Sequence, residues 1–205
     1  LRFRKELLSV LTGPEVDLVC FSPVTADVAW ALDLAEQVKR RRQDLFVVLG
    51  GPHATTMPET LLTGNAVDCV VAGEGETTVL DLVRSLDANG RPPRNPGFYY
   101  RENGRVTGTR PRIPEDNMDD WPFADRTLFR QAFPGLAGIH MVTSRYCPNR
   151  CAYCQNNALR RVYPDRFPVR RYTPGRVVEE LAQANTEFPA PSVRFFDELF
   201  SADPA

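Results

Sequence analysis

The sequence predicts an α/β protein with a doubly wound parallel sheet, followed by a second, shorter α/β segment. Through residues 3–90, short continuous apolar runs alternate with segments of helical periodicity. Such alternation is typical of parallel strands joined by crossover helices. A proline-rich stretch at 91–137 comes next, and one more strand–helix–strand pattern occupies 138–205. We therefore expect three parts, at 1–90, 91–137 and 138–205.

The helices of the first part are predicted from apolar residues spaced three and four apart. The first helix is expected to end at Gly13 and Pro14, which stop helices. Pro58 predicts the start of a short helix that ends before Gly64. The expected buried faces are Phe3, Leu7, Val10 and Leu11, then Val28, Ala31, Leu32, Ala35 and Val38, and last Val79, Leu82, Val83 and Leu86.

Continuous apolar runs predict three strands covered on both faces. They lie at 17–22, 45–51 and 67–76. Cys20 and Cys69 fall inside two of these runs, so we expect them to be small core residues. Ligands of such sheets bind at the carboxyl ends of the strands. The loops of interest are therefore 22–25, 50–55 and 73–76.

The middle part is predicted to hold a hairpin turned at Asn103 and Gly104, and then an ordered linker at 115–126. The second domain should open with a strand at 138–144. A helix follows, with Thr173 as its N-cap and Pro174 in its first turn. The next strand is expected at 192–200, and it would leave an open edge.

Composition excludes several classes of function. The 205 residues are 42% hydrophobic and 25% charged, as in globular proteins, and the formal net charge is −1. No basic field points to nucleic acid or to an anionic membrane, and no apolar run could span a bilayer. Five cysteines in a clustered pattern do not resemble a secreted disulfide framework, and no secretory signal opens the chain. We expect a cytoplasmic protein.

The stretch "TSRYCPNRCAYCQN" places Cys147, Cys151 and Cys154 within eight residues. A zinc site normally closes with a fourth ligand, and neither histidine has suitable spacing. A disulfide would use two of these thiols and leave the third one unpaired. A [4Fe–4S] cluster held by three thiolates keeps one iron open, although zinc and inert core thiols remain alternatives.

The spacing Cys147-x3-Cys151-x2-Cys154, with Tyr153 before the last cysteine, resembles the motif of the radical S-adenosylmethionine (SAM) superfamily. The resemblance implies a cluster whose open iron binds SAM and whose electron cleaves it to a 5′-deoxyadenosyl radical. It implies a partial (β/α) barrel whose first strand is 138–144, and an electron donor such as flavodoxin or ferredoxin. It places Tyr153 near the adenine.

The same resemblance makes Asp197 and Glu198, at the second barrel strand, candidates to hold the SAM amino group; a solvated strand end is the alternative. Related motifs commonly carry glycine at the position of Tyr146. The arginines between 145 and 171 form either a patch for an anion, a solvated face, or contacts to further barrel strands. They are Arg145, Arg150, Arg160, Arg161, Arg166, Arg170 and Arg171.

The segments "VDLVCFSPVT", "VVLGGPHAT" and "VDCVVAGEGETTVLDLV" resemble, in this order, the Rossmann-like cobalamin-binding domain that precedes one class of radical SAM enzymes. "MDDWPFADR" resembles the connector between the two domains. Small residues let the nucleotide tail of the corrin pass between strand ends, where glycine permits close approach. The implied cobalamin-binding candidates are Ser22, Thr25, Gly50, Gly51, His53, Gly73 and Glu74.

Some roles stay open at this point. The Asp-x-His-x-x-Gly element that supplies a cobalt ligand in some cobalamin proteins does not occur, so His53 is either a substitute ligand or a residue of the following helix. Glu74 and Glu76 either contact the cofactor or favour the next helix N-terminus.

The chain begins without Met and stops just after an apolar run. We expect a piece of a longer protein that lacks the first strand of the cobalamin-binding fold and most barrel strands, and that is inactive alone. Methylation, rearrangement or ring formation on a small molecule is the expected chemistry. An empty cobalamin-like domain, or a non-catalytic metal-binding module, is the alternative.

Overall fold

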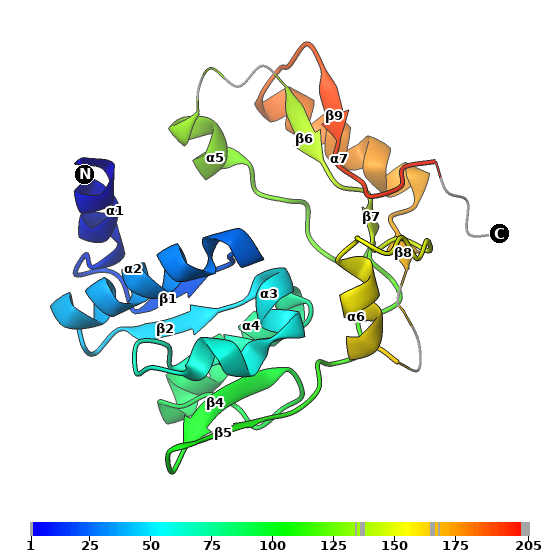
Figure 1. Cartoon of the computed structure of the whole chain (residues 1–205). Coiled ribbons are helices and arrows are strands. Elements are labelled where there is room, and N and C mark those ends of the chain that lie inside the picture. The colour runs from blue at the N-terminus through cyan, green and yellow to red at the C-terminus, as the bar shows by residue number, and fades with distance from the viewer. Residues whose placement is uncertain (1, 134, 136–137, 165–166, 168, 202–205) are drawn as a thin grey trace. The chain divides into compact units, whose positions relative to one another are not determined.

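The computed structural model describes residues 2–133, 135, 138–164, 167 and 169–201, and the chain forms two compact units (Figure 1). The first unit comprises Leu1–Pro114 and Tyr153–Pro164, and the second comprises Glu115–Ala152 and Asp165–Ala205. In the part of the chain that the structure describes, no helix is long and apolar enough to cross a membrane.

A five-stranded sheet in the order β1-β2-β3-β4-β5 forms the centre of the first unit. Its first three strands are parallel, as predicted, and β4 and β5 are antiparallel to their neighbours. The predicted hairpin is confirmed, because Asn103 and Gly104 both have positive φ, but it extends the sheet and makes it mixed. The strands are β1 (Leu18–Phe21), β2 (Phe46–Leu49), β3 (Cys69–Val71), β4 (Phe98–Glu102) and β5 (Arg105–Gly108).

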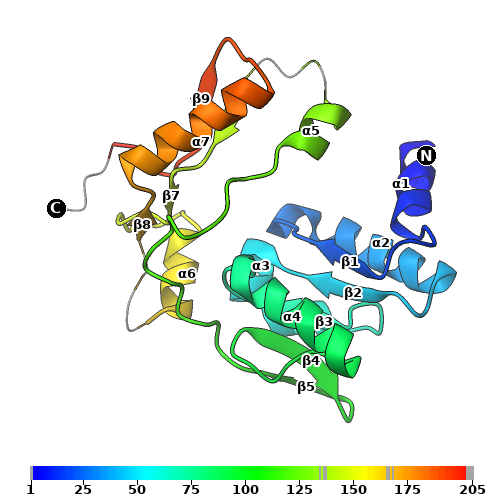
Figure 2. The ribbon, with the colours of Figure 1, turned by 180° about the vertical axis from the view of Figure 1, so that it is seen from behind.

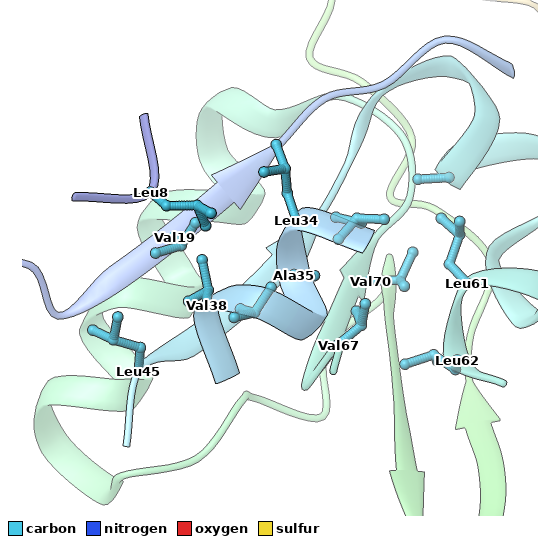
Figure 3. Close-up of a cluster of buried hydrophobic side chains, with 13 residues drawn as sticks. Leu8, Val19, Leu34, Ala35, Val38, Leu45, Leu61, Leu62, Val67 and Val70 are labelled. Atoms are coloured by element: carbon cyan, nitrogen blue, oxygen red, sulfur yellow. The ribbon is translucent and has the colours of Figure 1, made fainter. Parts of the chain in front are cut away.

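Helices cover both faces of this sheet, with α2 on one side and α4 on the other (Figures 1 and 2). Val47 and Leu49 point into the larger core beside α2, part of which Figure 3 shows, while Val48 points into the core beside α4. Continuous apolar runs form these strands because side chains alternate between two covered faces. The helical segments are α1 (Arg2–Leu11), η1 (Thr25–Asp27), α2 (Val28–Arg41), α3 (Gly51–Thr56), η2 (Pro58–Leu62), α4 (Gly75–Asn89) and α6 (Asn156–Val162).

Three predictions about burial in the first unit are wrong. In α4, Val83 is 45% exposed, although it was expected on the buried face of this helix. In α1 the buried residue is Leu8, while Phe3 and Val10 are 70% and 67% exposed. Cys20 is also exposed, because β1 is an edge strand and α4 packs against β3 and β4. Cys69 is fully buried, as predicted.

The second unit contains two small sheets. Strands β6 (Ile139–Met141) and β9 (Val193–Phe195) are parallel, and β7 (Ser144–Arg145) pairs antiparallel with β8 (Arg170–Arg171). Helix α7 (Pro174–Glu187) packs against β6, and α5 (Thr127–Ala132) precedes that strand. Both predicted strands are shorter than expected: the first ends at Met141, and the second stops before Phe196.

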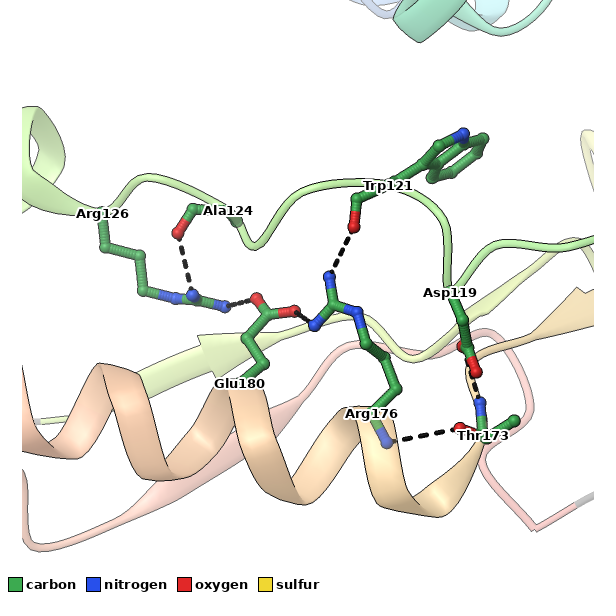
Figure 4. Close-up of polar contacts among 7 residues, drawn as sticks. All are labelled: Asp119, Trp121, Ala124, Arg126, Thr173, Arg176 and Glu180. Carbon is green, nitrogen blue, oxygen red and sulfur yellow. Dashed lines mark hydrogen bonds and ion pairs between the residues drawn. The ribbon is translucent and has the colours of Figure 1, made fainter.

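Charged side chains join α7 to the preceding linker (Figure 4). Glu180 accepts from Arg126 at 2.6 Å and from Arg176 at 2.9 Å, and Arg176 also donates to the carbonyl oxygen of Trp121. The predicted N-cap is confirmed, since the Thr173 side chain accepts from the Arg176 N–H, and Asp119 accepts from the Thr173 N–H. The linker thus supplies Arg126 and the Trp121 carbonyl oxygen as partners for the buried charges of α7, and these contacts hold the linker in place.

Candidate cofactor sites

The carboxyl ends of β1, β2 and β3 lie at one edge of the sheet, because these strands are parallel. There Ser22 follows β1, and Gly50 and Gly51 follow β2. Gly51 has φ +88°, and a Cβ atom on it would lie 2.6 Å from the Ser22 Oγ. Only glycine fits this backbone and this spacing. The structure thus brings together three of the predicted residues in a cradle of small groups.

The end of β3 is tied to α3, which follows β2, through Thr55, a residue of the predicted loop 50–55 that was not among the predicted binding residues. The Thr55 Oγ1 accepts from the Gly73 N–H at 2.9 Å. Gly73 has φ +94°, and a Cβ atom there would meet Pro111 at 2.8 Å and the Tyr163 hydroxyl at 2.9 Å. Within the first unit, Gly73 is therefore enclosed by the ends of two later segments, one of which follows α6.

His53 lies on α3, where both of its ring nitrogens face threonine hydroxyls. Nδ1 is 3.1 Å from the Thr25 Oγ1, and Nε2 is 3.4 Å from the Thr60 Oγ1. Thr25 is a predicted site residue, and Thr60 is an addition from the structure. A cobalt ligand role for His53 would require one of these contacts to break, so the geometry favours a role in which His53 links α3 to η1 and η2.

Glu74 stands at the N-cap of α4 with extended backbone, and its side chain makes no capping hydrogen bond. Its carbonyl oxygen accepts from the Thr78 hydroxyl at 2.8 Å. Glu76 lies in the first turn of α4, where the helix dipole favours a negative charge.

The cysteine loop begins after β6 and crosses the boundary between the two units. Cys147 and Cys151 belong to the second unit, whereas Cys154 begins the path to α6 in the first. None of the three is in a disulfide. Among the described residues, no group of three or more His, Cys, Asp or Glu side chains is assembled as a metal site. We therefore argue for the cluster from the donor set.

That donor set fits iron. Three thiols occupy one short loop, and thiolates are the usual ligands of iron–sulfur clusters. Cys69 is not an alternative donor, because it lies fully buried in the apolar core beside α4, where burial also raises the pKa of its thiol to about 12. The cradle at Ser22 and Gly51 likewise fits a group that approaches the backbone closely, as the tail of a corrin would.

The loop leaves the second unit through an unusual backbone conformation. Tyr146, directly before the first cysteine, has φ +63°, in the left-handed region that favours glycine. Its ring lies 5.0 Å from that of Phe167. The structure thus gives a physical reason why related motifs use glycine at this position. Tyr153 is 94% exposed.

Asp197 follows β9 and contacts the start of the cysteine loop. Its Oδ1 accepts from the Thr143 N–H and from the Thr143 hydroxyl, each at 2.9 Å, and from the Ser144 hydroxyl. Its neighbour Glu198 is exposed. Asp197, one of the two predicted acids, is thus hydrogen-bonded to the start of the loop.

Several arginines of the loop region are structural rather than solvated. Arg170 is buried and donates to the carbonyl oxygen of Glu115, and both Arg145 and Arg170 lie over the ring of Trp121. Arg171 donates to the carbonyl oxygens of Phe200 and Leu199. Arg150 is exposed, and Arg166 lies outside the described residues.

Comparisons with known proteins agree with this arrangement. The family model of the B12 binding domain matches residues 4–83. An uncharacterized methyltransferase of Pyrococcus horikoshii is 30% identical over 200 residues, which cover 96% of this chain and 42% of that protein. The hopanoid C-3 methylase of Methylococcus capsulatus is 32% identical over 148 residues, 67% of this chain and 27% of that protein. The chain thus spans less than half the length of these relatives.

An anaerobic magnesium-protoporphyrin IX monomethyl ester cyclase of Rubrivivax gelatinosus is 28% identical and covers 80% of this chain and 31% of its own length. Among solved structures, the cobalamin-dependent SAM radical enzyme OxsB, with aqua-cobalamin and SAM bound, has a TM-score of 0.74 at 20% identity. It covers 96% of this chain and 27% of its own. The radical SAM methyltransferase TsrM of Kitasatospora setae has a TM-score of 0.67 at 16% identity, covering 96% and 39%. These two likenesses show the fold.

Proposed function

We propose that this chain, whose residues 4–83 match the B12 binding domain, is the cofactor-binding part of a radical SAM enzyme that methylates a small-molecule substrate. One observation carries this proposal. A single chain combines a glycine cradle at the carboxyl ends of three parallel strands with a three-cysteine loop that follows a fourth. Each of these two features is suited to one of the two cofactors.

The chain's own residues have distinct tasks. Cys147, Cys151 and Cys154 would hold a [4Fe–4S] cluster, and Gly51 and Ser22 would admit the corrin tail beside the backbone. When bound, these cofactors supply one electron for SAM cleavage and a methyl group on cobalt. Tyr153 would pack against the adenine, and Asp197 or Glu198 would accept a hydrogen bond from the SAM amino group. The remaining candidates, Thr25, Gly50, His53, Gly73 and Glu74, would line the corrin side.

Methylation is favoured over ring formation because two of the relatives quoted above are named as methyltransferase or methylase. The cyclase among them keeps ring formation as the alternative outcome. We propose only the class of substrate, a small molecule. This chain corresponds to 42% of the Pyrococcus relative, so it does not contain all the residues that could select a particular substrate. A flavodoxin or ferredoxin is the proposed electron donor.

The cluster is tested on the protein encoded by the complete open reading frame around this chain. Anaerobic reconstitution with iron and sulfide should give about four irons per chain, and replacing the three cysteines by alanine should abolish this uptake. Reductant and SAM should then release 5′-deoxyadenosine, with flavodoxin or ferredoxin able to replace the chemical reductant. One zinc per chain, without iron, would instead support the non-catalytic metal-binding module.

The corrin is tested by visible absorption after incubation with hydroxocobalamin and removal of unbound ligand. Gly51→Ala should reduce retention of the corrin, because the new methyl group collides with the Ser22 hydroxyl. Gly90→Ala is the matched control: Gly90 also has positive φ, at +65°, but a Cβ atom there meets nothing within 4 Å. Absence of corrin retention in the unsubstituted protein would show that the domain is empty.

A further inference from the structure

We propose that Asp197 is a positioning residue that fixes the start of the cysteine loop, in addition to any contact with SAM. This inference rests on the proposed function only in its consequence for the cluster. It starts from topology: β6 and β9 are parallel neighbours, so their carboxyl ends lie at one edge, where the cysteine loop leaves β6 and Asp197 follows β9.

Three donors converge on a single oxygen of the Asp197 carboxylate. The Thr143 N–H and Thr143 hydroxyl each donate at 2.9 Å, and the Ser144 hydroxyl donates to the same Oδ1. Thr143 and Ser144 are both buried. Hydrogen bonds to an ionised acceptor are stronger than neutral ones, and buried donors that lose their acceptor are costly. Asp197 is therefore the group that satisfies the polar atoms of this loop start.

The backbone on both sides reinforces this attachment. The N–H of Phe196, directly before Asp197, donates to the carbonyl oxygen of Met141 at 2.8 Å. Ser144 itself pairs with Arg171 in the second small sheet. Only Arg145 and Tyr146 separate Ser144 from the first cysteine. Holding Thr143 and Ser144 thus sets the position from which Cys147 begins.

The second oxygen of the carboxylate differs from the first in its hydrogen bonding. Asp197 Oδ2 is buried and has no hydrogen-bond partner within the described part of the chain. One oxygen holds the loop, while the other still has capacity for a donor. The two roles can be separated by Asp197→Asn: its amide oxygen can serve the three donors, whereas its amide nitrogen replaces the oxygen that is left over.

The experiment compares Asp197→Ala, Asp197→Asn and the control Glu179→Ala, an exposed acid on α7 of the second unit. Hydrogen exchange is followed in the metal-free protein for peptides that contain Thr143 and Ser144, and iron per chain is measured after reconstitution. Asp197→Ala should accelerate exchange at the Thr143 amide at least about tenfold, because the hydrogen bond of this amide to a charged acceptor is lost, and it should lower iron retention. Glu179→Ala should match the unsubstituted protein in both measurements. Asp197→Asn should lie much closer to the unsubstituted protein than Asp197→Ala does, because its amide oxygen keeps an acceptor for the three donors without the charge.

A second pair keeps the test decisive if Asp197→Ala does not fold. Thr143→Val removes one of the three donors and should give an intermediate increase in exchange, while Thr143→Ser should restore protection. Thr186→Val, at an exposed threonine on α7, is the control. Unchanged exchange in Asp197→Ala, or in Thr143→Val, would overturn the proposal. Failure of the unsubstituted protein to bind iron would contradict the proposed function instead, and the exchange data would still decide the role of Asp197.

Discussion

The two compact units keep their structure by different means. In the first, strand β2 lies between two apolar layers: Val47, Val48 and Leu49 are all at most 2% exposed. In the second, the buried side chains include Arg170, Arg176 and Glu180. Strand β9 exposes apolar surface to solvent. Val193 is 41% exposed there.

This difference bears on how each unit responds to change. Apolar burial is roughly proportional to area, so each lost side chain weakens the first unit by a limited amount. A buried charge network requires all its partners, because a charge left alone is far costlier than the pair is stabilising. The second unit should therefore be the more sensitive to single polar substitutions, and it is the unit that carries Cys147 and Cys151.

The largest effect is expected from Glu180→Ala. Arg126 and Arg176 would both lose their carboxylate while remaining mostly buried, which should cost about 3–5 kcal/mol of unfolding free energy. The measurement is urea unfolding in a Trp30→Phe background, so that fluorescence reports Trp121 of the second unit. Glu179→Ala, one residue away and exposed, should change little. A loss below about 1 kcal/mol, the range of exposed ion pairs, would remove the contrast between the units.

Leu34→Ala is the corresponding change in the first unit. Leu34 is fully buried in the larger core, so we expect a loss of about 2–5 kcal/mol from transfer and cavity terms. Leu80→Ala is the control, because Leu80 lies at an exposed position on α4 and its truncation leaves no buried cavity. Urea unfolding followed by Trp30 fluorescence measures both. Equal stability of the two variants would mean that this core does not hold the first unit.

The sequence predicted the first unit better than the second for the same physical reason. Continuous apolar runs report local structure, and the predicted runs at 17–22, 45–51 and 67–76 contain the strands Leu18–Phe21, Phe46–Leu49 and Cys69–Val71. They could not distinguish an edge strand from a central one, so Cys20 was wrongly expected in the core. The pairing of the hairpin with β3 is also non-local and leaves no periodic signal.

The candidate ligand residues could be predicted from the sequence, whereas the residues that hold their loops in place could not. Spacing alone made the three cysteines candidate ligands, and the strand ends made the loops with Ser22 and Gly51 candidate binding segments; these stay predictions. The contacts of Asp197 with Thr143 and Ser144 span more than fifty positions of sequence, so no local pattern could show them. The roles of Thr55 and Thr60 likewise arise only when separate segments meet.

A smaller effect is expected at the beginning of α7, where the linker and the helix meet. Thr173→Ala removes the side-chain oxygen that accepts from the Arg176 N–H, and loss of such a cap costs about 1 kcal/mol. The same fluorescence-detected urea unfolding in the Trp30→Phe background measures it. Thr186→Ala, on the exposed side of the same helix, is the control. If both variants lose the same amount, the cap adds nothing to the second unit.

The smallest change tests the loop that joins the units. At Tyr146 the left-handed backbone costs a non-glycine residue about 1–2 kcal/mol, while contact between its ring and Phe167 returns about 0.5–1.5 kcal/mol. Tyr146→Gly removes both terms, so we expect a net change below about 1 kcal/mol. Tyr146→Ala removes the ring but keeps most of the backbone cost, and it should be less stable than the glycine variant by about 1 kcal/mol. Urea unfolding of the two variants gives this difference directly. An alanine variant as stable as the glycine variant would mean that the backbone at this position is unstrained. The contact between Tyr146 and Phe167 would then have no backbone cost to offset.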